Sequence, residues 1–189
     1  MTTFVIDYET NGLNPFHDDV IEIAIKVLGT DKSFECLVIH QNKKGLPGKI
    51  TEITGITNQL LKEKGLNHKD AYTKMISFIE ENTSEEEPFY LVAHNGQGFD
   101  FIFFKKALRI MNKKFDNVRY VDSLFLSKVV NPSQYSHSMK TLCKVYNVVN
   151  EQEHRALGDV NALEKIMDIM MKKGNLSSVE EVYNATEFI

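Results

Sequence analysis

The amino-acid sequence predicts an α/β fold, in which a mixed sheet of five strands is flanked by helices. Two observations lead to this prediction: three β-patterned segments come first, and helical and strand patterns alternate after them. The chain of 189 residues fits one domain, since domains commonly hold about 100–200 residues. No internal repeat, low-complexity tract or linker divides it, so residues 1–189 are expected to form a single domain.

The first three strands are expected to be antiparallel neighbours. Residues 4–6 form a short apolar run that ends before turn residues, which is typical of a buried strand. Residues 20–28 alternate apolar and polar side chains, and residues 34–39 are rich in β-forming residues, so these two segments should pair. A loop rich in glycine, proline and lysine is expected at 42–49. Two further apolar segments, 89–93 and 118–121, lie between helical segments and should add parallel strands.

The helices are predicted from apolar residues that recur every three or four positions. The segments with this spacing are 70–81, 103–111, 138–145 and 157–171, and a further helix should follow Ser123. Ser138 is a candidate N-cap, and Gly174 should end the helix before it. Ser177 and Glu180 have the spacing of a capping box, which would open a C-terminal helix at about 177–189.

Charge and composition exclude several classes of protein. The 22 basic and 26 acidic residues give a net charge of −4, which excludes a polybasic protein that binds nucleic acid by bulk charge alone. A nucleic-acid enzyme whose acidic site is offset by metal ions is still allowed. The two cysteines, Cys36 and Cys143, cannot form a disulfide framework, and no apolar run approaches the ~18 residues of a membrane span. Without a signal-peptide pattern, we expect a soluble intracellular protein that does not bind membranes.

Two acidic residues, Asp7 and Glu9, follow the apolar run of the first strand. Because strand side chains alternate, both should face the same side of the sheet, roughly 6–7 Å apart. Two like charges on a buried strand are unfavourable unless a cation lies between them, and carboxylate oxygens suit Mg²⁺ or Mn²⁺. The alternative is a frayed strand end with both acids in water. Tyr8 should point to the opposite face, into the core.

Two further acids also stand in apolar surroundings. Asp100 lies among phenylalanines where a helix should begin, so it could cap that helix or bind a metal. Asp159 shares a helical stripe with Leu163 and Ile166 and therefore points toward the core, an unusual place for an unpaired acid. His154 is expected on the loop before this helix, where it could move. Taken by itself, this histidine would be interpreted as a surface residue.

In chain order these residues form three motifs: Asp-x-Glu at 7–9, His-Asn-x-x-x-Phe-Asp at 94–100, and His-x-x-x-x-Asp at 154–159. This pattern resembles the DEDDh (DnaQ-like) family of 3′→5′ exonucleases. The spacing from His94 to Phe101 looks closest to the three-prime repair exonuclease branch, and segments 54–56, 121–123 and 138–142 agree with it. The resemblance covers about residues 4–171, and it implies a ribonuclease H-like fold.

The resemblance implies metal-dependent hydrolysis of phosphodiesters. Asp7, Glu9, Asp100 and Asp159 would bind two divalent cations, Mg²⁺ or Mn²⁺, which stabilise the attacking and leaving oxygens. His154 would be the general base. The expected activity is the removal of nucleoside 5′-monophosphates from the 3′ ends of DNA, preferentially single-stranded DNA.

The resemblance also implies where the terminal nucleotide binds. Thr10, Asn11 and Gly12 would offer backbone N–H groups, while Leu13 and Ile56 would wedge against the last bases. The alternatives are an ordinary turn and two core positions. His94 and Asn95 are counted with this substrate-binding set as supports of the site.

Basic residues gather in two segments that could contact phosphates, or could simply form solvated faces. Nucleic-acid binding would then be weak, salt-sensitive and independent of sequence. The residues are Lys105, Lys106, Arg109, Lys113, Lys114 and Arg119 in one segment, and Lys43, Lys44 and Lys49 in the other.

Two alternatives of function stand beside the DNA exonuclease. One is an RNA-directed exoribonuclease or oligoribonuclease, because discrimination of the 2′-hydroxyl depends on the geometry of the pocket. The other is a catalytically silent nucleic-acid-binding module of the same fold. The four prolines are not clustered, so the proline-rich insertion and membrane tail of better-known members of this branch are not expected here. Monomer and homodimer both stay open.

Overall fold

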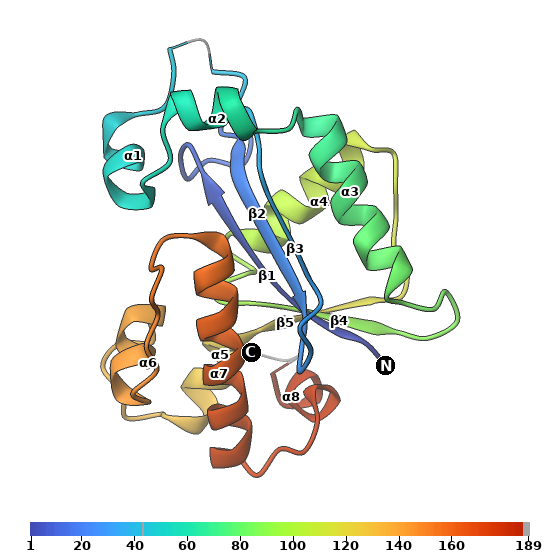
Figure 1. Ribbon diagram of the computed structural model, residues 1–189. Coiled ribbons are helices and arrows are strands. Elements are labelled where there is room, and N and C mark those ends of the chain that lie inside the picture. Colours follow the sequence, from blue (N-terminus) through green and yellow to red (C-terminus); the bar gives the residue numbers. More distant parts are fainter. Residues whose placement is uncertain (43, 187–189) are drawn as a thin grey trace.

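A five-stranded sheet forms the centre of the computed structural model, which describes residues 1–42 and 44–186 (Figure 1). The strands lie in the order β3-β2-β1-β4-β5. β2 is antiparallel to both β1 and β3, whereas β4 is parallel to both β1 and β5. Their bounds are β1 (Thr3–Thr10), β2 (Val20–Val27), β3 (Ser33–Leu37), β4 (Phe89–Ala93) and β5 (Val118–Asp122). The predicted ribonuclease H-like sheet of antiparallel and then parallel strands is confirmed.

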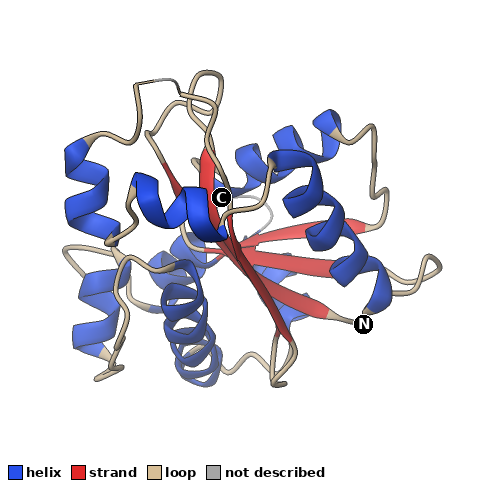
Figure 2. Ribbon diagram, turned by 45° about the horizontal axis from the view of Figure 1, so that its top comes forward, coloured by secondary structure: helices blue, strands red, loops and turns tan. Residues whose placement is uncertain are grey.

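Helices cover both faces of this sheet (Figure 2). The helices α3 (His68–Glu81) and α4 (Asp100–Ile110) pack on one face, where their apolar side chains form a cluster with β1 and β2. The opposite face is covered by α5 (Ser123–Val130), α6 (Met139–Val145), α7 (Ala156–Lys173) and α8 (Val179–Thr186). Within the described residues, no helix is both long enough and apolar enough to cross a membrane.

The central strand β1 divides its side chains between these two layers. Phe4, Ile6 and Tyr8 belong to the cluster with α3 and α4, whereas Val5 belongs to the cluster with α7. Because side chains alternate along a strand, Asp7 and Glu9 continue the row of Val5 and face the α7 side. Tyr8 is buried on the opposite face, as predicted, and its hydroxyl donates to the sulfur of Met75 at 3.2 Å.

Two short helices at the upper end of β1 and β2 in Figure 1 were not predicted: α1 (Gly48–Thr54) and α2 (Asn58–Lys64). Each has seven residues, too few for a clear apolar period, and α1 begins after Pro47 without a side-chain cap. Gly55 ends α1 with a φ of 70°, and the Thr57 hydroxyl accepts the Leu60 N–H at the start of α2. These helices are held by a small separate apolar cluster rather than by the main core.

The capping residue of the last helix also differs from the prediction. Ser178, not Ser177, caps α8: its hydroxyl accepts the Glu181 N–H at 3.2 Å, and the Glu181 carboxylate accepts the N–H of Ser177. The reason is that Ser178 and Glu181 have the same three-residue spacing as Ser177 and Glu180. The helix is described to Thr186, so the predicted helical residues 187–189 lie outside the described part of the chain. By contrast, Ser138 caps α6 as expected, accepting the Thr141 N–H.

Substitution of Ile56 tests whether that residue is core. Its side chain is 0% exposed and packs with Ile21, Leu46 and Leu61 under α1 and α2. We expect Ile56→Ala to lower the free energy of unfolding by about 2–4 kcal/mol because it leaves a cavity. Ile53→Ala, on the exposed side of α1, is the matched control and should cost less than about 1 kcal/mol. Urea unfolding followed by circular dichroism measures both, and equal losses would contradict the assignment.

Candidate active site

The predicted acids and histidine meet where the carboxyl end of β1 lies beside the first turn of α7. One ligand atom from each of Glu9, His154 and Asp159 lies within 4.8 Å of the other two. Glu9 comes from β1, Asp159 from the first turn of α7, and His154 from the loop before that helix. Sequence positions separated by about 150 residues are therefore brought together by packing of α7 on β1.

Asp7 and Asp100 complete the acidic cluster. Asp100 begins α4, and its carboxylate accepts the N–H of Tyr8, the residue between the two acids of β1, at 3.2 Å. Phe99, and not Asp100, holds the N-cap position of this helix. Asp7 lines the same cavity as His154 and Asp159. All four acids and the histidine predicted for the site thus lie at one end of the sheet.

Burial and mutual repulsion make the carboxylates of this cluster hard to ionise. Burial is the largest cause of the raised pKa of Asp7, and Asp100, Asp159 and Glu9 raise it further. Burial, followed by the charge of Asp159, raises the pKa of Glu9 to about 8. The pKa of Asp100 is raised to about 7, although two backbone hydrogen bonds oppose this shift. Ionising these groups together therefore requires positive charge from outside the cluster.

The donor set fits divalent cations. Carboxylate oxygens are hard ligands of the kind that Mg²⁺ and Mn²⁺ prefer, and several of them converge here. The raised pKa values of Asp7 and Glu9 also favour a cation site, since cations would relieve the repulsion that holds protons on these two acids. Asp7, Glu9, Asp100 and Asp159 are the residues that could hold them.

An ion pair between the buried Glu22 and the partly exposed Arg155 fixes the loop that carries His154. Glu22 on β2 is paired in register with Glu9 and is only 3% exposed. Its Oε1 accepts from Arg155 Nε at 3.0 Å and from Arg155 Nη2 at 2.6 Å. Its Oε2 accepts from Arg155 Nε at 3.1 Å and from the Ala156 N–H at 2.9 Å. Glu22, on β2, therefore caps the N-terminus of α7 and holds Arg155, the residue that follows His154.

Neither Glu22 nor Arg155 was singled out from the sequence. Glu22 lies in an apolar strand, which is the same signal that identified Asp100, but the alternation of β2 placed it on an apparently solvated face. That face is covered by α7, and Arg155 also lowers the pKa of Glu9. Both residues thus contribute to the electrostatics of the site.

The loop before α7 has an unusual backbone. His154 has a φ of 65°, in the left-handed region that residues with a Cβ seldom adopt. Asn150 on the same loop donates from Nδ2 to Asp159 Oδ1 at 2.6 Å. Gly158 lets the loop lie against α7, because a Cβ there would come within 2.4 Å of the Gln152 carbonyl oxygen. His154 is on this loop, as predicted, and its side chain is half-exposed.

The predicted substrate-binding residues of the β1–β2 turn have different environments. Leu13 is 83% exposed and free to contact a ligand. The Asn11 N–H was expected to bind substrate, but it donates to the Asp19 carbonyl oxygen at 3.0 Å, so it is not available in this turn. The Thr10 hydroxyl bonds the Gly12 carbonyl oxygen at 2.6 Å. At Gly12 a Cβ would lie 2.3 Å from the Asp18 carboxylate, so a larger residue there would displace the Asp18 side chain.

The remaining predicted substrate residues lie further back. The expected wedge role of Ile56 does not fit the structure, because its side chain is fully buried in the apolar cluster under α1 and α2. His94 lines the cavity with Asp7, but Nδ1 lies 2.8 Å from Ser123 Oγ and Nε2 lies 2.8 Å from the His137 carbonyl oxygen. The exposed Asn95 has a φ of 60°, and its N–H donates to Asp122. His94 therefore supports the cavity wall.

Four of the basic residues predicted to contact phosphates have partners elsewhere. Lys106 donates to the Asp18 carbonyl oxygen at 2.8 Å, and Lys105 lies over the Tyr120 ring. Lys113 pairs with Glu80, and Lys114 pairs with Asp116. Because Lys105, Lys106, Arg109, Lys113 and Lys114 extend along and beyond α4, they do not line the cavity that contains Asp7. Lys43 lies outside the described residues.

Comparison with known proteins identifies the family. Residues 4–167 match the RNase T family, described as "Exonuclease". The chain belongs to this exonuclease family. Its members are 3′→5′ exonucleases of DnaQ-like fold, so the resemblance deduced from the three motifs is confirmed at the level of the family and of the hydrolase class.

The relatives by sequence include DNA polymerases. The chain is 32% identical over 179 residues to the PolC-type DNA polymerase III of Mycoplasma genitalium and 30% identical over 175 residues to that of Bacillus subtilis. Each alignment covers 90% of this chain but only 12% and 11% of the polymerase. The chain thus spans about one-eighth of these relatives, and the finer likeness to the three-prime repair branch stays a prediction.

Solved structures confirm the fold. Escherichia coli exonuclease I in complex with a dT13 oligonucleotide superposes with a TM-score of 0.75 at 19% identity, covering 91% of this chain and 41% of that protein. The complex with a dA16 oligonucleotide gives a TM-score of 0.76 at 18% identity, with 97% and 42% covered. A zinc-bound form of the same protein also matches, with a TM-score of 0.74 at 18% identity over 91% of this chain and 40% of that protein.

The acidic cluster predicts how stability depends on pH and metal. In protein treated with EDTA, we expect the free energy of unfolding to fall as pH rises from about 7 to about 8.5. The raised pKa of Asp7 and Glu9 means that the folded state binds more protons than the unfolded state in this range. His68 and His94 act in the opposite direction, because their pKa is lowered, but their effect falls mainly below pH 7.

Added Mg²⁺ at a hundred times its Kd should therefore raise the melting temperature by about 5–10 °C. At one Mg²⁺ concentration the rise should be larger at pH 8.5 than at pH 7. Thermal unfolding by circular dichroism measures this. Glu9→Gln should weaken both dependences, whereas Asp168→Asn, on the exposed side of α7, is the matched control. A melting temperature that responds to neither pH nor Mg²⁺ would contradict the electrostatic account.

Removal of Arg155 should destabilise the fold more than removal of an exposed cation. Arg155→Ala leaves the Glu22 carboxylate buried without its partner, so we expect a loss of about 3 kcal/mol in the free energy of unfolding. Lys172→Ala, which breaks the exposed pair with Asp168, should cost less than about 1 kcal/mol. Urea unfolding compares the two. Equal losses would show that the Glu22 pair does not hold the start of α7.

Proposed function

We propose that this chain removes nucleoside 5′-monophosphates one at a time from the 3′ ends of DNA, with a preference for single strands. The observation that carries the proposal is the convergence of Glu9, His154 and Asp159 to within 4.8 Å, with Asp7 and Asp100 in the same acidic cluster. A silent binding module would have no need for all four acids and a histidine at one place.

The residues of the site divide the reaction between them. Asp7, Glu9, Asp100 and Asp159 would hold two divalent cations, Mg²⁺ or Mn²⁺. When bound, such ions stabilise the charge that develops on the attacking and leaving oxygens of a phosphodiester. Because these carboxylates repel one another, binding of divalent ions to the site is favourable.

His154 would act as the general base. As a water molecule attacks the terminal phosphorus and forms the new P–O bond, the imidazole accepts a proton from that water. The P–O3′ bond breaks, and the 3′ oxygen stays on the shortened strand and takes a proton from solvent. The position of His154 on a half-exposed loop beside Glu9 and Asp159 allows it to reach the water and to release the proton.

Two kinds of relative support DNA as the substrate. The sequence relatives are DNA polymerases, and the structural neighbours are complexes of exonuclease I with the single-stranded oligonucleotides dT13 and dA16. The exposed Leu13, in the turn that follows β1, offers an apolar contact for an unpaired terminal base. An unpaired 3′ end also reaches a cavity more easily than a paired one.

A time course on 5′-labelled DNA and RNA oligomers with Mg²⁺, Mn²⁺ or EDTA tests the proposal. We expect a DNA ladder that shortens by one nucleotide at a time and disappears with EDTA, with slower cleavage of duplex DNA and RNA. His154→Ala should lower kcat by about 10²–10⁴-fold, since a general base contributes that much. Asp7→Asn should abolish cleavage, whereas Asp168→Asn should leave it unchanged.

The alternatives have their own outcomes in the same assay. A faster RNA ladder would replace DNA by RNA as the substrate. If the wild-type chain bound oligomers and left them intact with every metal, the catalytic proposal would fail in favour of a binding module.

A further inference from the structure

One wall of the active-site cavity is basic. The cavity has a volume of about 530 Å³ and contains Asp7, His154 and Asp159. The helix α6 forms part of the cavity lining, to which it contributes Lys140 and Lys144. These two residues are the lysines of this cavity among the described residues, and they lie one helical turn apart on one face of α6.

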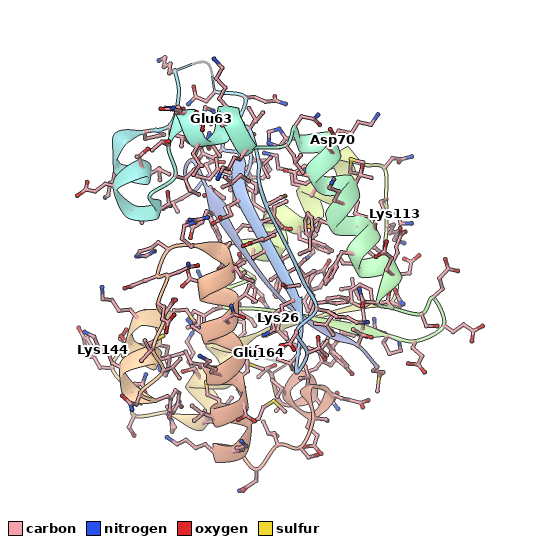
Figure 3. All side chains as sticks on the ribbon, in the orientation of Figure 1. Lys26, Glu63, Asp70, Lys113, Lys144 and Glu164 are labelled. Carbon is pink, nitrogen blue, oxygen red and sulfur yellow. The ribbon has the colours of Figure 1, made fainter. Side chains whose placement is uncertain are left out.

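The two lysines differ in what they contact. Lys140 Nζ lies 3.5 Å from Glu153 Oε1, and that same carboxylate oxygen lies 3.7 Å from His154 Nε2. Glu153 thus connects α6 to the loop that carries His154. Lys144 projects from α6 (Figure 3), and within the described residues its ammonium group has neither a hydrogen-bond partner nor an ion-pair partner.

A strand of nucleic acid that enters this cavity meets mainly negative charge. The four acids, together with Glu153, repel phosphates, and cations at the acids would act only on the phosphate that is cut. A neighbouring phosphate of the strand needs a separate positive partner. The lysines that extend along and beyond α4 cannot supply it, because they are engaged away from this cavity.

We propose that Lys140 and Lys144 together bind one backbone phosphate of the nucleic acid strand, and that Glu153 occupies Lys140 until the strand arrives. This proposal rests on the proposed exonuclease function and names further substrate-positioning residues for it. Binding of the phosphate releases the Glu153 carboxylate from Lys140, so Glu153 competes with the substrate for the same ammonium group. Because Glu153 competes for Lys140, a strand that cannot reach both lysines should bind more weakly.

Binding of 5′-fluorescein dT12, followed by fluorescence anisotropy between about 50 and 200 mM NaCl, tests the proposal. All proteins carry Asp7→Asn so that the strand is not consumed. Lys140→Gln and Lys144→Gln should each raise Kd by about three- to five-fold. The double substitution should reduce the slope of log Kd against log salt by about 0.7, the value for one phosphate contact on a single strand.

The role of Glu153 is tested by a double-mutant cycle. Glu153→Gln should tighten binding by about three-fold when Lys140 is present and by clearly less together with Lys140→Gln, where only the repulsion between Glu153 and the phosphate is relieved. Lys172→Gln is the matched control, because Lys172 is also exposed and paired with a carboxylate, at 2.6 Å from Asp168, but lies at the far end of α7. Its Kd should equal that of the parent protein.

The outcomes separate this inference from the proposed function. If wild-type protein shortens dT12 with Mg²⁺ but both lysine variants bind like Lys172→Gln, the lysine contact is overturned and the exonuclease stands. If wild-type protein binds dT12 without shortening it, the exonuclease fails, while the titration still decides the lysine contact. Absence of binding by the wild-type protein would overturn both.

Discussion

Repulsion among four carboxylates at the end of β1 is the constraint around which this structure is built. Two of them, Asp7 and Glu9, lie on the central strand, and the other two lie in the first turns of α4 and α7. The N-terminus of a helix has partial positive charge and free N–H groups, so Asp100 and Asp159 occupy positions where a carboxylate is tolerated. The fold thus assembles the acids from three elements instead of crowding them on one.

The neighbouring charges are arranged in a second row behind the acids. Glu22 lies next to Glu9 across the β1–β2 pair and would increase the repulsion if it were alone. Arg155 neutralises it and, at the same time, lowers the pKa of Glu9. Because the Glu22 carboxylate also accepts the first N–H of α7, one ion pair fixes the helix that carries Asp159 and the loop that carries His154.

The sequence singled out the four acids that the structure brings together, because they stand in apolar segments and fall in the three motifs. It was insufficient for Arg155 and Glu22, whose contact joins residues 133 positions apart. Ile56 was misjudged for a related reason, since its burial depends on two short helices with little periodicity of their own. The lysines along and beyond α4 looked like a phosphate-binding surface because charge is visible in a sequence, whereas the pairing of a lysine with an acid such as Glu80 is not.

The two acids on β1 and the loop that carries His154 should differ in how often their backbone opens. β1 is paired with β2 along Phe4–Thr10 and with β4 at Thr3–Val5, so the part of the strand that carries Asp7 and Glu9 should open only when the β1–β2 pairing opens. His154 instead sits at a φ of 65° on a loop outside any helix or strand. Local opening of that loop removes the histidine while the carboxylates of the strand keep their arrangement. Asp7 and Glu9 should therefore keep their positions as long as the sheet is folded, whereas His154 should leave the site more often.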